Sequence, residues 1–147
     1  MKAGQQQRLL AVVQPVLGQG EQVELLTFAG VGSVSVKRRV ATAAVTTALT
    51  GGLLTMNVRP RRFYVALTSE RVLFFNGDTV TGRPESKVAM QAPRPALSVA
   101  SSKKGLLTAT VQVAIAGQEK GLKFVFPLPM RSDVPAFVAA LGEAPAA

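Results

Sequence analysis

Few side chains in this sequence have the type and spacing for covalent chemistry. Residues 101–104, Ser-Ser-Lys-Lys, match the pattern S-x-x-K, in which a lysine can activate a serine as a nucleophile. That chemistry also needs the partner motifs S-D-N and K-T-G, and the sequence contains neither. We therefore expect Ser101 to Lys104 to form a polar turn with two surface lysines. The chain has no His and no Cys, which excludes a Ser-His-Asp triad, a Cys-His dyad and a Cys/His zinc site.

Motifs for nucleotide and RNA binding are incomplete. The run Gly30-Val31-Gly32 lacks the third glycine of a dinucleotide fingerprint. The segment Lys120–Phe126 shares Lys, Gly, Phe and Val with an RNA-recognition strand, but Leu122 replaces a stacking aromatic residue. A basic nucleic-acid-associated protein is therefore an alternative that the motifs favour less than other binding functions.

The eight acidic residues do not have the spacing of a metal site or of a paired acid and base. We expect Glu21 and Glu24 to face opposite sides of a strand edge, and Glu70-Arg71 to shape a turn. The sequence thus predicts no catalytic residue, no metal ion and no cofactor, and a protein that is not an enzyme.

Positive charge is concentrated in one stretch of the chain. The chain has 17 Lys and Arg against 8 Asp and Glu, for a net charge of +9, and no acid lies between Glu24 and Glu70. Such an acid-free run is typical of a surface that binds a polyanion or an acidic protein, as well as of a simply solvated surface. We predict that an anionic lipid surface or a protein partner binds the six cations of this stretch: Lys37, Arg38, Arg39, Arg59, Arg61 and Arg62.

An uncharged insert at 40–58 separates the two groups of cations. Its nineteen residues include only three Leu, three Val and one Met, with five Thr and a central Gly51-Gly52. A membrane span needs about 20 predominantly apolar residues, so this composition favours a span less than two other interpretations. The insert can pack on the domain or on another subunit, which would make the protein a homo-oligomer, or it can dip into a membrane interface.

Alternating apolar residues predict about six or seven antiparallel strands. The segment at 63–75 reads F-Y-V-A-L-T-S-E-R-V-L-F-F. Its first residues alternate between the two faces of a half-buried strand, and Ser69-Glu70 can make the turn to the next strand. Gly30 and Gly32 predict a bulge or bend, and Pro93 and Pro95 predict edge strands or a bend. The strands are expected at 22–36, 63–68, 72–75, 86–91, 96–100, 107–115 and 122–126.

Two segments have helical spacing instead. Apolar residues predict a short helix within 5–17, ended by Pro15 and the glycines that follow. Ser132 or Asp133 can cap a second helix, whose apolar stripe is Phe137, Val138 and Leu141. We therefore divide the chain into a leading helix at 1–20, a domain at 21–142 with the insert at 40–58, and a tail at 143–147.

Three segments, in this order along the chain, resemble the bacterial pleckstrin-homology-like domains, including GRAM-like and YokE-like modules. The segments are F-Y-V-A-L-T-S-E-R-V-L-F-F, G-R-P and A-P-R-P-A-L-S-V. The resemblance covers roughly residues 22–142. It implies a mainly β (α+β) fold, a PH-like bent antiparallel sandwich or barrel of about seven strands capped by a C-terminal helix. The final helix lacks the Trp of eukaryotic members, and Phe137 can fill its space.

The resemblance also implies a binding module whose lipid-binding cations lie in the loop between the first two strands, although this connection is far longer than usual. The polar start of the chain is followed by only five apolar residues, Leu9 to Val13, too few for a secretory segment. The absence of Cys fits a reducing compartment. We therefore expect a cytoplasmic protein that can attach at the inner face of the membrane.

Overall fold

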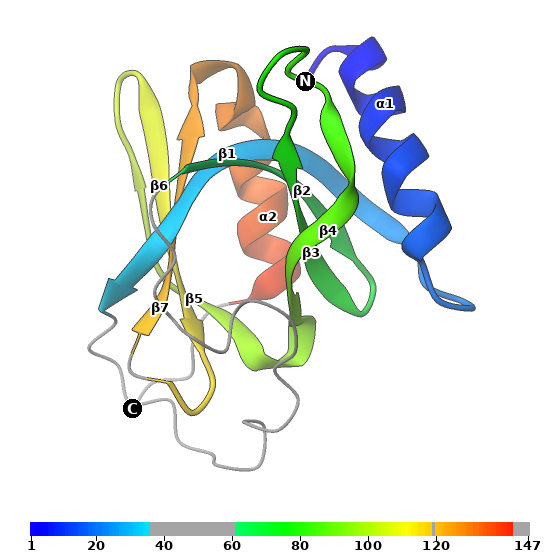
Figure 1. The fold of residues 1–147 in the computed structure, drawn as a ribbon. Helices are drawn as coiled ribbons and strands as arrows, with labels where there is room; N and C mark the ends of the chain where they lie inside the picture. Colours follow the sequence, from blue (N-terminus) through cyan, green and yellow to red (C-terminus); the bar gives the residue numbers. More distant parts are fainter. Residues whose placement is uncertain (36–60, 119, 143–147) are drawn as a thin grey trace.

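A computed structural model describes residues 1–35, 61–118 and 120–142 of the chain, which form one antiparallel sheet flanked by helices (Figure 1). The strands are β1 Val23–Ser35, β2 Arg61–Thr68, β3 Arg71–Gly77, β4 Pro84–Pro93, β5 Leu97–Lys104, β6 Thr108–Ile115 and β7 Lys120–Pro127. The helices are α1 Ala3–Val13 and α2 Val134–Leu141, with short 3-10 turns η1 Gln14–Val16, η4 Arg94–Ala96 and η5 Leu128–Asp133. The insert expected at 40–58 and the tail expected at 143–147 lie outside the described residues.

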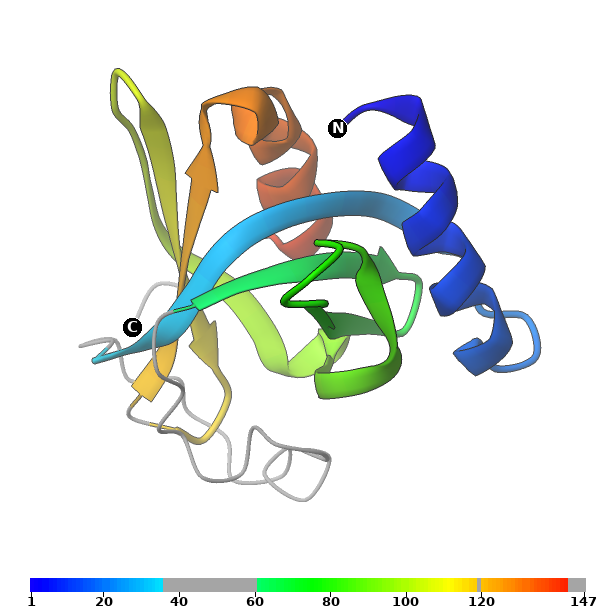
Figure 2. The same cartoon turned by 45° about the horizontal axis from the view of Figure 1, so that its top comes forward.

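The long strand β1 connects the two halves of the sheet, whose strand order is β4-β3-β2-β1-β7-β6-β5. β1 pairs with β2 from Val23 to Val31 and with β7 from Gly30 to Ser35, and Figure 2 shows it as a continuous arc across the molecule. The change of partner falls at Gly30, where a bend or bulge was expected. The register shift between β1 and β2, however, lies between Val23 and Leu25.

The inner face of the bent sheet encloses the aromatic core, and α2 packs into the open end. The ring centroid of Phe137 lies 4.9 Å from that of Phe124 and 5.3 Å from that of Phe126. Val134 and Leu141 of the same helix are also buried. The expected architecture is confirmed: a mainly β arrangement of seven antiparallel strands with a C-terminal helix.

Helix α1 covers the outer face of the other half of the sheet, against β2, β3 and β4. Leu9 and Val13 of this helix form a second apolar cluster with Tyr64, Ala66, Leu73 and Phe75. The expectation that the strand beginning at Phe63 is half-buried is therefore wrong, because all its residues from Phe63 to Thr68 are buried. The inner residues meet the main core, and the outer residues meet α1.

Three local expectations differ from the structure. Ser101 to Lys104 belong to strand β5 rather than to a turn. Leu107 precedes β6 and is 71% exposed, because the hairpin turn holds it out of the sheet. Asp133 occupies the N-cap position of α2 but makes no capping bond, since its Oδ2 accepts a hydrogen bond from Thr27 Oγ1 at 2.9 Å. The prolines near 93–95 do mark an edge, because β4 and β5 are the two outer strands.

A buried polar network joins the leading segment to the sheet. Arg71 donates hydrogen bonds to both carboxylate oxygens of Glu21, at 2.9 and 3.0 Å, and to the carbonyl oxygen of Val16 at 2.6 Å. Glu21 also accepts hydrogen bonds from the Thr68 hydroxyl and from the backbone N–H of Gly18. Because Glu21 is only 7% exposed, these donors replace the water that it has lost.

The same network sets the protonation of Glu21. The hydrogen bond from Arg71 is the largest cause that lowers the pKa of this carboxyl from its ordinary value of 4.5 to about 2, and it outweighs the burial, which raises the pKa. Glu24 is in a different setting: it pairs with Arg94 at 2.8 Å and its side chain is 40% exposed.

We predict that Glu21→Gln lowers the free energy of unfolding at pH 7 by about 2 kcal/mol, because hydrogen bonds to a charged group are lost beside Arg71. Since the pKa of Glu21 is lower in the folded state, its contribution is complete above pH 4.5 and is lost as the pH falls towards 2. Urea unfolding should therefore show a smaller deficit at pH 3 than at pH 7. The control Glu24→Gln should cost less than about 1 kcal/mol, because its ion pair is more exposed. A Glu21→Gln deficit that is the same at both pH values would contradict the assignment.

Candidate functional site

Two of the six cations expected to bind an anionic surface lie within the described residues. Arg61 and Arg62 open strand β2, and both are exposed. The other four, Lys37, Arg38, Arg39 and Arg59, lie outside the described residues. The site is therefore built from what surrounds Arg61 and Arg62.

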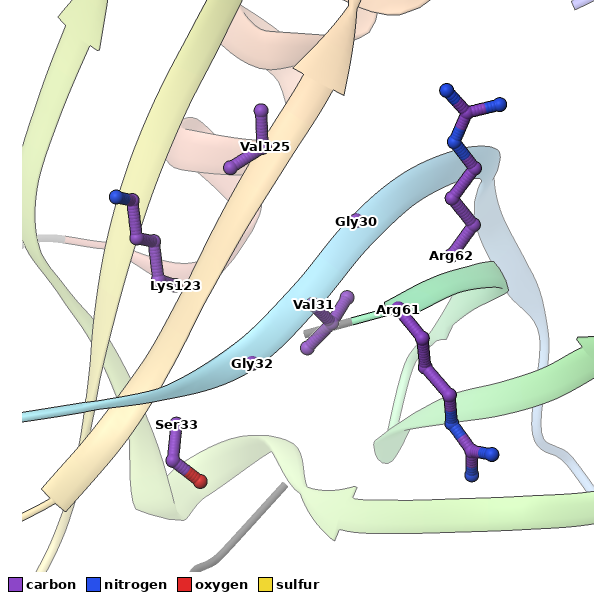
Figure 3. A pocket seen from close by; sticks show the side chains of 8 residues that line it. All are labelled: Gly30, Val31, Gly32, Ser33, Arg61, Arg62, Lys123 and Val125. Carbon is purple, nitrogen blue, oxygen red and sulfur yellow. The ribbon is translucent and has the colours of Figure 1, made fainter. Parts of the chain in front are cut away.

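Arg61 and Arg62 extend to opposite faces of the sheet, as neighbours in a strand must (Figure 3). The Arg61 guanidinium lies 4.8 Å from the centroid of the Phe63 ring, on the core side of β2, where the ring face attracts a cation. Arg62 extends from the outer side. The structure therefore does not gather these two cations into one cluster.

Cross-strand pairing brings two other cations to the same outer face as Arg62. Residues that pair directly in antiparallel strands point to the same side of a sheet. Two adjoining rows of paired residues consequently share this face: Arg62–Gly30–Val125–Thr110–Lys103 and Gly32–Lys123–Gln112–Ser101. We call this surface the basic face.

The basic face combines charge with small and uncharged side chains. Lys103 and Lys123 are exposed, and neither row contains an acidic residue. No ion pair with a described residue neutralises Arg62 or Lys123. The sequence predicts Lys103 as a surface lysine, but it does not predict that Lys103 and Lys123 share a face with Arg62, because that placement depends on the register of four separate strand pairs.

An open trough of about 440 Å³ runs along β1 within this part of the sheet. The trough exists because Gly30 and Gly32 present no side chains between β2 and β7. Figure 3 shows Arg62 on one side of these glycines and Lys123 and Val125 on the other. The complete lining is Gly30, Val31, Gly32, Ser33, Arg61, Arg62, Lys123 and Val125.

The lining of the trough has groups that can bind an anion. Its lining offers the planar fork of an arginine and the point charge of a lysine, both suited to phosphate or carboxylate oxygens. It includes no carboxylate. Across the described part of the chain, no three acidic side chains come together as they would around a metal ion. Within the same ranges, no helix is both long enough and apolar enough to cross a membrane.

Solved structures with a similar fold include two bacterial proteins. One is a DUF1696 family protein with a pleckstrin-homology domain from Shewanella loihica, which is 19% identical with a TM-score of 0.48 over 92% of this chain and 88% of that chain. The other is a pleckstrin homology domain from Shewanella amazonensis, which is 18% identical with a TM-score of 0.43 over 90% of this chain and 93% of that chain. No family model and no curated protein matches the sequence.

The open space of the trough leaves room for a side chain at its central glycine, Gly30. A Cβ at Gly30 would meet the Val125 Cβ and carbonyl oxygen at 3.8 Å, an ordinary contact, and Gly30 is not among the glycines with positive φ. We expect Gly30→Ala to raise the free energy of unfolding by about 0.4–1 kcal/mol, because it restricts the unfolded chain without strain in the folded one.

The matched control is Gly82→Ala, at a position where φ is +72°. This change should lower the free energy of unfolding by about 1 kcal/mol, because L side chains disfavour that conformation. Urea denaturation measures both variants. A loss of stability for Gly30→Ala as large as that for Gly82→Ala would show that the trough is not open space.

Proposed function

We propose that this chain is a non-enzymatic binding module that attaches to an anionic membrane surface through the basic face. The observation that carries the proposal is the pair of cross-strand rows that place Arg62, Lys123 and Lys103 on one face with no acidic residue among them. Arg62 and Lys123 line the trough, and Lys103 lies farther along the same face, on β5. The cations at Lys37, Arg38, Arg39 and Arg59 belong to the connection that leaves β1 at Ser35 and re-enters β2 at Arg61, and the proposal includes them as part of the same attachment.

The positions of the two helices on the sheet support the choice of the basic face. α1 occupies the outer side of the half that contains β3 and β4, and α2 lies against the inner side of the other half. Among the described elements, none covers the outer side of β7, β6 and β5, where Thr110, Gln112 and Val125 remain partly exposed. A broad, uncovered and slightly hollow face can lie against a surface of many anionic headgroups.

Electrostatics gives the expected strength and behaviour of this attachment. Each Lys or Arg near an anionic bilayer contributes about 1 kcal/mol, and the contribution falls within about one Debye length, near 10 Å at 0.1 M salt. Three cations on the basic face therefore contribute about 3 kcal/mol, too little for tight binding alone. The attachment should be weak, strongly dependent on salt and dependent on further cations from the connection.

We expect the double variant Arg62→Gln/Lys123→Gln to bind vesicles of phosphatidylcholine with phosphatidylserine about 30-fold more weakly than the wild type, because two contributions of about 1 kcal/mol are lost. The matched control is Arg83→Gln/Lys87→Gln, which removes two exposed cations at the edge strand β4. Sedimentation with vesicles at low salt measures both. Vesicles of phosphatidylcholine alone should capture little of any variant.

Four results would contradict the proposal. The wild type could ignore anionic vesicles, or the two double variants could lose binding equally. It could bind short DNA or RNA more tightly than vesicles at the same salt, which would favour a nucleic-acid function. It could also ignore anionic vesicles and instead form a defined oligomer that a deletion of 45–55 dissolves, which would make the insert an assembly element.

A further inference from the structure

The hairpin between β5 and β6 ends in two exposed leucines. Leu106 is 92% exposed and Leu107 is 71% exposed. Leu128 is 53% exposed and follows Pro127, the partner of Thr108 in the pairing of β6 with β7, so it leaves the sheet at the same end. Among the described residues only Val80 is a further large apolar side chain of this kind. Exposed apolar groups therefore collect at one end of the sheet.

The shape of the hairpin tip is fixed by hydrogen bonds. The N–H of Gly105 donates to the carbonyl oxygen of Thr108 at 2.8 Å, and a Cβ at Gly105 would approach that oxygen at 3.0 Å, so glycine suits this tight turn. Arg131 of η5 donates from Nη1 to the carbonyl oxygen of Leu106 at 3.1 Å. In Figures 1 and 2 the hairpin projects beyond the rest of the sheet next to η5. The leucines are thus held out of the protein by an ordered backbone.

Positive charge surrounds this apolar tip. Lys103 and Lys104 directly precede the turn and both are exposed. The segments 97–115 and 120–132, which form the hairpin, the neighbouring strand and most of η5, contain no acid. Lys103 belongs to the row that includes Arg62, so the tip adjoins the end of the basic face, whereas Lys104 points to the opposite side of β5.

We propose that Leu106 and Leu107 insert into the interface of an anionic bilayer while Lys103 and Lys104 contact its headgroups. This proposal rests on the proposed function and adds the orientation in which the module meets the membrane. Apolar side chains gain by leaving water, and the adjacent lysines gain by approaching negative charge, so one anionic bilayer satisfies both groups. A second copy of the chain docked tip to tip would bring four lysines together without an intervening acid, which like-charge repulsion disfavours.

The salt dependence of binding separates the two contributions. In phosphatidylserine vesicles at high salt, where charge attraction is screened, Leu106→Ser/Leu107→Ser should reduce binding about tenfold or more relative to the wild type. Lys103→Gln/Lys104→Gln should reduce binding mainly at low salt. Both changes affect exposed side chains, so thermal unfolding should stay close to that of the wild type and show that the variants are folded.

A fluorescent reporter tests insertion directly, because the chain contains no Trp. The emission of Leu107→Trp should shift to shorter wavelength with anionic vesicles and be quenched by brominated lipids. The control Gln7→Trp places the reporter on an exposed position of α1, away from the hairpin in both views, and should show neither effect.

The outcomes are distinguishable. Binding of the wild type to anionic vesicles, with no effect of Leu106→Ser/Leu107→Ser and no shift for Leu107→Trp, overturns the insertion of the tip and leaves the proposed function intact. No binding of the wild type overturns the proposed function and the insertion with it. A wild-type dimer that Leu106→Ser/Leu107→Ser dissolves shows that the tip is a contact between copies, and also overturns the insertion.

Discussion

The double pairing of β1 is the constraint on which the rest of the structure depends. β1 pairs with β2 along its first part and with β7 along its last part, and the strand bends as it passes from one partner to the other (Figure 2). The bend gives the sheet an inside, which Phe124, Phe126 and Phe137 fill. It also gives the sheet an outside, where Gly30 leaves room between β2 and β7. The aromatic core and the trough are therefore two consequences of the same strand path.

The two halves of the sheet differ in what covers them, and the Glu21–Arg71 network accounts for part of this difference. Its hydrogen bonds attach the end of the leading segment, through Val16 and Gly18, to the start of β3. With that end fixed, α1 lies along the outer face of β2 and β4, and Leu9 and Val13 are buried there. No described element packs on the corresponding face of β7, β6 and β5. Lys103 and Lys123 are exposed on that face.

The sequence predicts those features that depend on neighbours in the chain. The alternation from Ala109 to Ile115 specifies a strand because its period of two is unbroken, and the stripe at Phe137 and Leu141 specifies a helix because its spacing is helical. The burial of β2 on both faces was not predictable in this way, since it depends on where α1 docks. Glu21 and Arg71 are 50 residues apart, and neither has a local pattern that reveals the other. The candidate site shows the same limit: the cluster of cations at 37–62 is visible as a run, whereas Lys103 and Lys123 join Arg62 only through strand register.

The arrangement of these cations bears on the kind of selectivity that the basic face can have. Specific recognition of one small molecule needs convergent polar groups in an enclosed pocket. Here Arg61 and Arg62 diverge, the trough is open, and Lys103 stands at the far end of a row that spans five strands. Under the proposed function, such a face would respond to the density of negative charge across a surface more than to the shape of one headgroup. Under the proposed insertion, the apolar tip adjoining that face would add a contact that charge cannot provide, because Leu106 and Leu107 can insert only into a surface with an apolar interior. Charge and apolar insertion together would therefore select an anionic bilayer over a dissolved polyanion, although neither does so alone.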